Sequence, residues 1–184
     1  MQSAVLLAII KSPLSKKRVE ELAKEIVASD FSIKKLIDLT FHEEEQIGFR
    51  ASWILESVYI NHTTHFLPDS TYFLSKFSEQ KNPSSRRHFG KIVALMTAKK
   101  APLYIVETVD AYNTDELVET VFSWLIDDCV PVAVKSHCLN ILANLASKHN
   151  WIKDELLETM DFLVDKESIA FYAKVKQIRK QLRK

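Results

Sequence analysis

Residues 125–149, LIDDCVPVAVKSHCLNILANLASKH, bring acidic, thiol and imidazole side chains together in the sequence. A cysteine becomes a nucleophile when a base lies within hydrogen-bond reach of its sulfur. His137 and Cys138 are consecutive, however, and consecutive residues of a helix point about 100° apart. Cys138 also recurs at helical spacing with the apolar residues Val134 and Ile141. We therefore expect a buried, unreactive thiol in this stretch and no catalytic residue, so the protein is not expected to be an enzyme.

The motif HTTH raises a second chemical question, because His62 and His65 have a spacing that could hold a metal on a continuous helix. No cysteine or carboxylate nearby completes a set of ligands. The motif also lies where a helix is expected to end, and a histidine there interacts favourably with the negative end of the helix dipole. No metal and no other cofactor is predicted.

The composition bounds the elements that must position any site. Two glycines and five prolines in 184 residues are too few for the turns of a β fold or the phosphate loops of a dinucleotide-binding fold. A hydrophobic content of 47% is enough to bury a core in one domain. The fold class is therefore predicted to be all-α.

Charge and cysteine content limit the cellular setting. The formal net charge of +1 produces no global field of the kind that marks nucleic-acid binders. The apolar start, residues 4–10, is far shorter than the roughly 20 residues that span a bilayer. Two cysteines make neither a disulfide framework nor a zinc site with four ligands. We expect a cytoplasmic protein with no membrane partner.

Apolar residues recur at helical spacing along almost the whole chain. Ser15 is placed to cap one helix, and Pro131 to open another that we expect to reach His149. From about residue 31, a shorter helix, a polar turn and a longer helix repeat about four times. Residues 1–30 are then expected to form N-terminal capping helices, and residues 1–184 a single domain. Further helices are predicted over residues 103–112, 151–164 and 168–182.

Residues 125–142, LIDDCVPVAVKSHCLNIL, resemble the turn of a HEAT repeat, in which an acidic turn precedes a proline and a basic residue. Lys135 stands at the basic position. The corresponding residues are Arg50 and Arg87. Arg87 follows Arg50 by 37 residues and Lys135 follows Arg87 by 48, and HEAT-type repeats are about 40–47 residues long. The match is looser around Trp53 and Gly90. The resemblance implies an α-α superhelix, a right-handed solenoid of antiparallel helix pairs.

In such a solenoid the second helices line a concave surface that suits recognition of a protein or peptide. We expect a non-enzymatic binding or scaffold module, although polar residues on these helices could equally be ordinary solvated surface. The residues expected on the concave face are Arg50, Arg87, Lys91, His137, Asn140, Asn144 and Lys148.

The C-terminal segment carries the clearest charge asymmetry. Its basic residues, Lys176, Arg179, Lys180 and Arg183, are predicted to face away from an apolar stripe, either as a solubilising cap or as a surface for nucleic acid. The alternative function is therefore nucleic-acid binding. The chain resembles the HEAT-like DNA alkylation-repair glycosylases in repeat architecture, and Trp124 beside Asp127 and Asp128 echoes their aromatic and acidic residues. Trp124 also fits the inward register of its helix, so we expect it to be buried.

Overall fold

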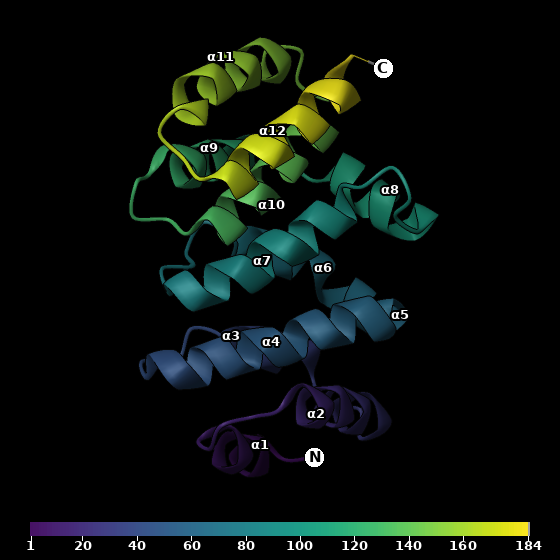
Figure 1. Cartoon of the computed structure of the whole chain (residues 1–184). Coiled ribbons are helices and arrows are strands. Elements are labelled where there is room, and N and C mark those ends of the chain that lie inside the picture. Colours follow the sequence, from purple (N-terminus) through teal and green to yellow (C-terminus); the bar gives the residue numbers. More distant parts are fainter. Residues whose placement is uncertain (184) are drawn as a thin grey trace. The chain divides into compact units, whose positions relative to one another are not determined.

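The computed structural model describes residues 1–183, and every regular element among them is a helix (Figure 1). Scarce glycine and a continuous helical periodicity produce this all-helical chain, as predicted. The α-helices are α1 (Ser3–Ile10), α2 (Lys16–Ala28), α3 (Ile33–Leu39), α4 (Glu45–Asn61), α5 (Thr63–Phe66), α6 (Ser70–Ser75), α7 (Pro83–Met96), α8 (Leu103–Ala111), α9 (Asp115–Ile126), α10 (Val132–Leu145), α11 (Ile152–Val164) and α12 (Ile169–Leu182), with a 3₁₀ turn, η1, over Leu67–Asp69.

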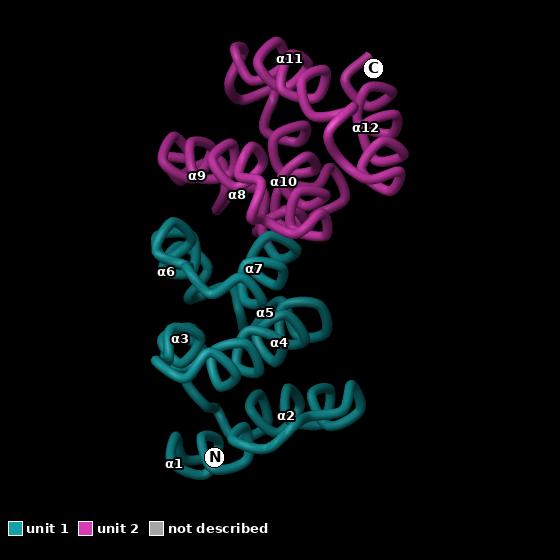
Figure 2. The backbone as a smooth tube through the Cα atoms, turned by 60° about the vertical axis from the view of Figure 1, so that its left-hand side comes forward, with its two compact units in different colours: residues 1–92 teal, residues 93–184 magenta. Residues whose placement is uncertain are grey.

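The chain divides into two compact units, residues 1–92 and residues 93–184 (Figure 2). The boundary falls inside α7. The single domain expected over residues 1–184 stays a prediction, and each unit is described by itself below.

Unit 1 has two rows of helices, with α1, α3 and α6 in one and α2, α4 and α7 in the other (Figure 2). Helices α1, α2 and α3 all pack on α4, and α3 also contacts α6. The Ser15 and Ser32 hydroxyls accept hydrogen bonds from the first turns of α2 and α3 and so start these helices. A cluster of aromatic rings lies in the core. Edge-to-face contacts join Phe66 to Phe73 and Phe41 to Phe89, and a tilted contact joins Phe73 to Phe89.

Unit 2 is built around α10, which contacts α9, α11 and α12. The predicted proline-led helix exists, but it ends at Leu145 and not at His149. The amides of Lys148 and His149 both bond to the Leu145 carbonyl and turn the chain away from the helix axis. Beyond this turn, the Lys148 ammonium bonds to carbonyls at the end of α8.

The residues whose chemistry the sequence had raised lie where packing was expected to place them. The side chains of Cys138 and Trp124 are buried in unit 2, and Cys129 is exposed in the turn before α10. In unit 1, α4 ends at Asn61, so the HTTH motif lies at the helix end as predicted, with His65 on the separate turn α5. Ser168 caps α12 through the amide of Phe171.

Candidate functional site

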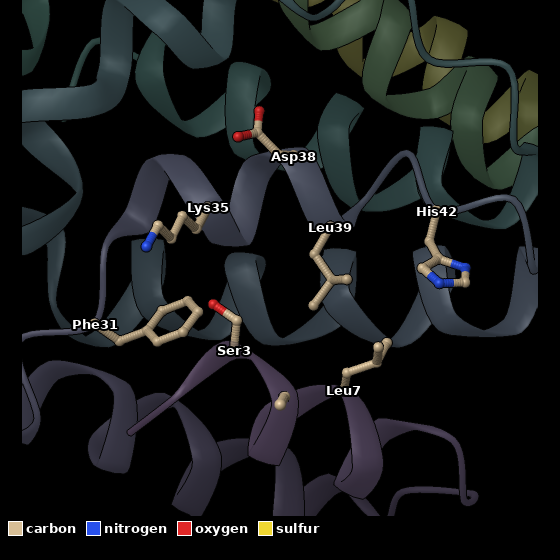
Figure 3. Close-up of a pocket in the computed structure, with 8 residues that line it drawn as sticks. Ser3, Leu7, Phe31, Lys35, Asp38, Leu39 and His42 are labelled. Atoms are coloured by element: carbon tan, nitrogen blue, oxygen red, sulfur yellow. The ribbon is translucent and has the colours of Figure 1, made fainter.

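An apolar groove of about 400 Å³ lies between α1 and α3 in unit 1 (Figure 3). Both helices pack on α4, and neither fills the space between them. Leu7 of α1 and Leu39 of α3 extend into this space from opposite sides (Figure 3). The lining residues are Ser3, Ala4, Leu7, Phe31, Lys35, Asp38, Leu39 and His42.

Helical spacing explains why these side chains share the groove. Leu7 and Ala4 are three residues apart on α1, so they occupy one face of that helix. On α3, Lys35, Asp38 and Leu39 recur at similar three- and four-residue spacing, and His42 follows just after the end of that helix. Helix α1 buries Leu6 and Ile10, which lie on another face. Its remaining apolar residues are therefore available to line the groove.

A Schellman turn at the end of α2 places Phe31 beside the groove. The Phe31 amide bonds to the Ile26 carbonyl, and the Asp30 amide to the Val27 carbonyl, the two bonds that define this motif. Asp30 adopts φ 51°, in the left-handed region that glycine usually occupies. The chain reverses there, and Ser32 caps α3 directly afterwards. The Phe31 ring is thereby held between α2 and α3.

The polar residues of the groove lie at its edge and are partly engaged. The Asp38 carboxylate points away from the cavity (Figure 3) and accepts a 2.5 Å hydrogen bond from the Tyr72 hydroxyl. That hydrogen bond raises the pKa of Tyr72. His42 Nδ1 accepts from the Glu44 amide at 3.0 Å, so Nε2 carries the proton of the neutral ring. With Lys35 exposed at the edge, the arrangement suits an apolar side chain flanked by polar groups.

Comparison with known protein families shows to which family the chain belongs. A family model for the HEAT repeat domain matches residues 8–182. The chain belongs to the HEAT repeat family. No curated protein and no solved structure gave a significant match. The predicted α-α solenoid class is confirmed, since the helical structure and the family agree.

The sequence reasoning missed the groove in this HEAT repeat protein, although a signal was present. Residues 4–10 are apolar without interruption. A surface helix normally buries one apolar stripe and exposes a polar face. A helix with apolar side chains on several faces therefore has more apolar surface than one neighbour covers. Val5 is 49% exposed, in agreement with that excess.

Two residues predicted on the concave face donate hydrogen bonds to carbonyls at helix ends. Arg50 donates to the carbonyls of Ile10 and Lys11 at the end of α1, each at 2.9 Å. The Lys148 ammonium donates hydrogen bonds to the carbonyls of Val109, Asp110 and Tyr112, at 2.8–3.1 Å. In each unit, a basic side chain thus satisfies the last carbonyls of a helix some 36–40 residues earlier.

Asn144 and Lys91 also have partners inside their own units. The Asn144 amide donates to the Ala94 carbonyl and the Thr97 hydroxyl, and its oxygen accepts from Gln181 at 2.9 Å. Lys91 donates to Glu56 at 2.8 Å. These side chains join helices, and any role in binding a partner stays a prediction.

Glu56 is the centre of a buried polar cluster that the sequence did not indicate. Its carboxylate lies 2.6 Å from His88 Nδ1, and the His88 ring packs beside Phe49 and Trp53. Burial alone would raise the pKa of Glu56, but the hydrogen bonds from His88 and Lys91 outweigh it and lower that pKa. The cluster joins α4 to α7 within unit 1.

The other predicted site residues are at least partly exposed. Arg87 is exposed on α7, and His137 and Asn140 are partly buried on α10. On α12, Lys176, Lys180 and Arg183 are exposed as predicted. Arg179 differs, because it forms an ion pair with Asp161 of α11 and does not belong wholly to the solvent face.

The described part of the chain, residues 1–183, lacks two other kinds of feature. In that range, no three histidine, cysteine or carboxylate side chains come together as metal ligands. Across the same residues, no helix has both the length and the apolar character needed to cross a bilayer.

Proposed function

We propose that this HEAT repeat protein is a non-enzymatic scaffold that binds a protein or peptide, and that the groove between α1 and α3 receives apolar side chains of that partner. The open, apolar groove of about 400 Å³ is the observation that carries the proposal. Its volume falls in the range of about 300–1,000 Å³ that is typical of binding pockets. HEAT repeats generally support protein interactions, which agrees with this use.

The geometry favours a helical or extended segment of a partner. Two helices form the walls, so apolar residues spaced by one helical turn could enter between them. Lys35 stands exposed at the edge, while Asp38 is held by Tyr72. An acidic residue next to the apolar anchors would therefore find a cation at the edge of the groove.

Filling the groove provides the test. In Ala4→Trp, an indole would occupy the cavity between α1 and α3, whereas Ala8→Trp places the same side chain on an exposed position of α1 outside the lining. Immobilised wild type and both variants are incubated with nuclease-treated cell extract, and bound proteins are quantified by mass spectrometry. Proteins retained by wild type and Ala8→Trp but lost with Ala4→Trp support the proposal. Identical captures by all three would reject it.

We propose further contact points for the same partner class in each unit, Arg87 on α7 of unit 1 and His137 and Asn140 on α10 of unit 2. Arg87 is exposed, and His137 and Asn140 are partly buried. Arg87→Ala and Asn140→Ala, tested in the same capture experiment, should each remove partners if the substituted residue contacts them. We also propose a cytoplasmic setting, since both cysteines are free.

Nucleic-acid binding is the second candidate function, and the exposed side of α12 favours it. Lys176, Lys180 and Arg183 are exposed there. The Lys176 ammonium lies 4.5 Å from the centroid of the half-exposed Tyr172 ring, whose other face could stack on a base. The nearly neutral chain opposes it, because phosphate contacts supply most of the affinity. Salt-sensitive binding of a single-stranded oligonucleotide that is lost in Lys176→Gln/Lys180→Gln would support this candidate.

A further inference from the structure

Helices α9 and α11 of unit 2 expose large apolar side chains that their own unit does not cover. The exposed fractions are 55% for Ile126, 51% for Trp151 and 59% for Phe162. Phe122 lies four residues before Ile126, on the same face of α9. Trp151, Glu155, Glu158 and Phe162 recur at four-, three- and four-residue spacing, so they follow one face of α11. Apolar patches of this kind mark sites of interaction.

Contacts between rings hold Trp151 in place although half of its surface is exposed. The Trp151 ring stacks on Phe122, with centroids 5.7 Å apart and planes at 24°. His149 meets the same indole edge-on at 6.4 Å. The Thr114 hydroxyl lies 2.7 Å from His149 Nε2 and orients that imidazole. Trp151 is therefore a preorganised aromatic anchor, the kind of residue that dominates the energy of protein interfaces.

The charge around this anchor is mostly negative. The Lys166 ammonium does lie over the Phe162 ring, 3.3 Å from its centroid. Helices α9 and α11 together carry seven acidic residues and one basic residue, Lys153. Glu119, Glu155 and Glu158 are exposed on the two helices. Trp151 and Phe162 lie eleven residues apart, about 16 Å along the helix axis. The surface thus alternates aromatic and acidic groups over about three helical turns.

We infer that this surface, named here the α9–α11 surface, docks a basic amphipathic segment of a partner protein. Apolar residues of the segment would cover Trp151, Ile126 and Phe162, while its lysines or arginines would face Glu119, Glu155 and Glu158. Binding requires both kinds of side chain. The apolar groups supply buried area, and the carboxylates select a cationic partner over an acidic one. The surface lies in unit 2, so it does not depend on the proposed groove in unit 1.

A designed peptide tests the partner chemistry with the full chain. The probe is a dye-labelled helix of about 18 residues, with leucine on one face and lysine on the other. One control replaces every lysine by glutamate, and a second scrambles the order of the residues. Fluorescence anisotropy should show the lysine peptide binding at least about tenfold more tightly than either control. Its affinity should fall as salt is added, because exposed charges are screened.

Matched variants locate the binding. Trp151→Ala and Glu155→Lys/Glu158→Lys should each weaken the lysine peptide by about tenfold or more. Glu20→Lys/Glu107→Lys makes the same change in net charge at exposed positions on α2 and α8, and it should bind nearly as wild type. Ala4→Trp should also leave this binding unchanged, which separates the α9–α11 surface from the groove. Circular dichroism checks that every variant is folded.

Three results would overturn the inference. Unchanged peptide affinity in Trp151→Ala and Glu155→Lys/Glu158→Lys would place binding elsewhere. An equal loss in Glu20→Lys/Glu107→Lys would show only a general attraction between charges. Sedimentation equilibrium supplies the third: if the chain self-associates and Glu155→Lys/Glu158→Lys abolishes the association, the surface is occupied by a second copy and not by a partner protein.

Discussion

Lys135 of α10 and Glu167, in the turn between α11 and α12, form an ion pair across 32 residues of sequence. The Lys135 side chain has no exposed surface, and that of Glu167 is 14% exposed. Glu167 is therefore the group that makes a buried ammonium tolerable at the centre of unit 2. Lys135 stands at the basic position of the HEAT-like turn, which here serves packing between neighbouring helix pairs.

Removing one partner of this ion pair should destabilise the protein more than replacing both partners by apolar residues. Glu167→Ala leaves the Lys135 ammonium buried without its partner and should cost about 3–5 kcal/mol. Lys135→Met/Glu167→Leu removes both charges, keeps similar volumes and should cost far less. Urea unfolding followed by circular dichroism measures both. Equal losses in the two variants would show that the volume of the side chains matters and their charge does not.

Acid should weaken unit 1 through Glu56. Because the folded-state pKa of Glu56 is lowered, its contribution to stability is present above the unfolded value, about 4.3, and is lost as pH falls through the folded-state pKa. Unfolding free energy measured from pH 7 downwards should decline less steeply below about pH 4.5 in Glu56→Gln than in wild type. Glu20→Gln, at a half-exposed carboxylate, serves as control and should follow wild type.

Gly48 of α4 should not tolerate a side chain. A Cβ at this position would lie 2.8 Å from the Thr40 carbonyl oxygen, closer than such atoms normally approach. Glycine to alanine inside a helix usually stabilises by up to about 1 kcal/mol. Here we expect Gly48→Ala to destabilise by about 1–3 kcal/mol, because α4 must move away from the end of α3. Thermal unfolding decides the sign, and an increase in Tm would contradict the close approach.

Lys148 should stabilise the protein through its hydrogen bonds to carbonyls at the end of α8. Lys148→Met removes donors from three carbonyls, which water can partly replace, so a loss of about 1–2 kcal/mol is expected. Lys153→Met, an exposed lysine on α11, provides the matched control and should be nearly neutral. A neutral Lys148→Met that nevertheless loses captured proteins would return this residue to the binding surface.

The two thiols should differ in reactivity. Cys129 is exposed and Cys138 has no exposed surface. A maleimide reagent should therefore modify one thiol per folded chain, at Cys129, and the second only in denaturant. Peptide mapping of the labelled protein assigns the sites. Rapid modification of Cys138 in the folded chain would mean that α10 is not packed as described.

The sequence by itself determined the helical class, the repeat family and much of the core. Period-3.6 spacing identifies buried positions such as Cys138 and Trp124 because one face of a helix must leave water. The capping serines Ser15 and Ser168 are equally local, since a cap bonds only within its own first turn.

Only the tertiary structure decided which polar and apolar side chains remain available to a partner. Arg50, Lys91 and Lys148 look like solvated residues in the sequence, yet each bonds to a group 35–40 residues away. The groove beside Leu7 exists because α1 and α3 pack on α4 without filling the space between them. Helical periodicity records which face of a helix is apolar, but it does not record which neighbour covers that face. That information lies in contacts between repeats.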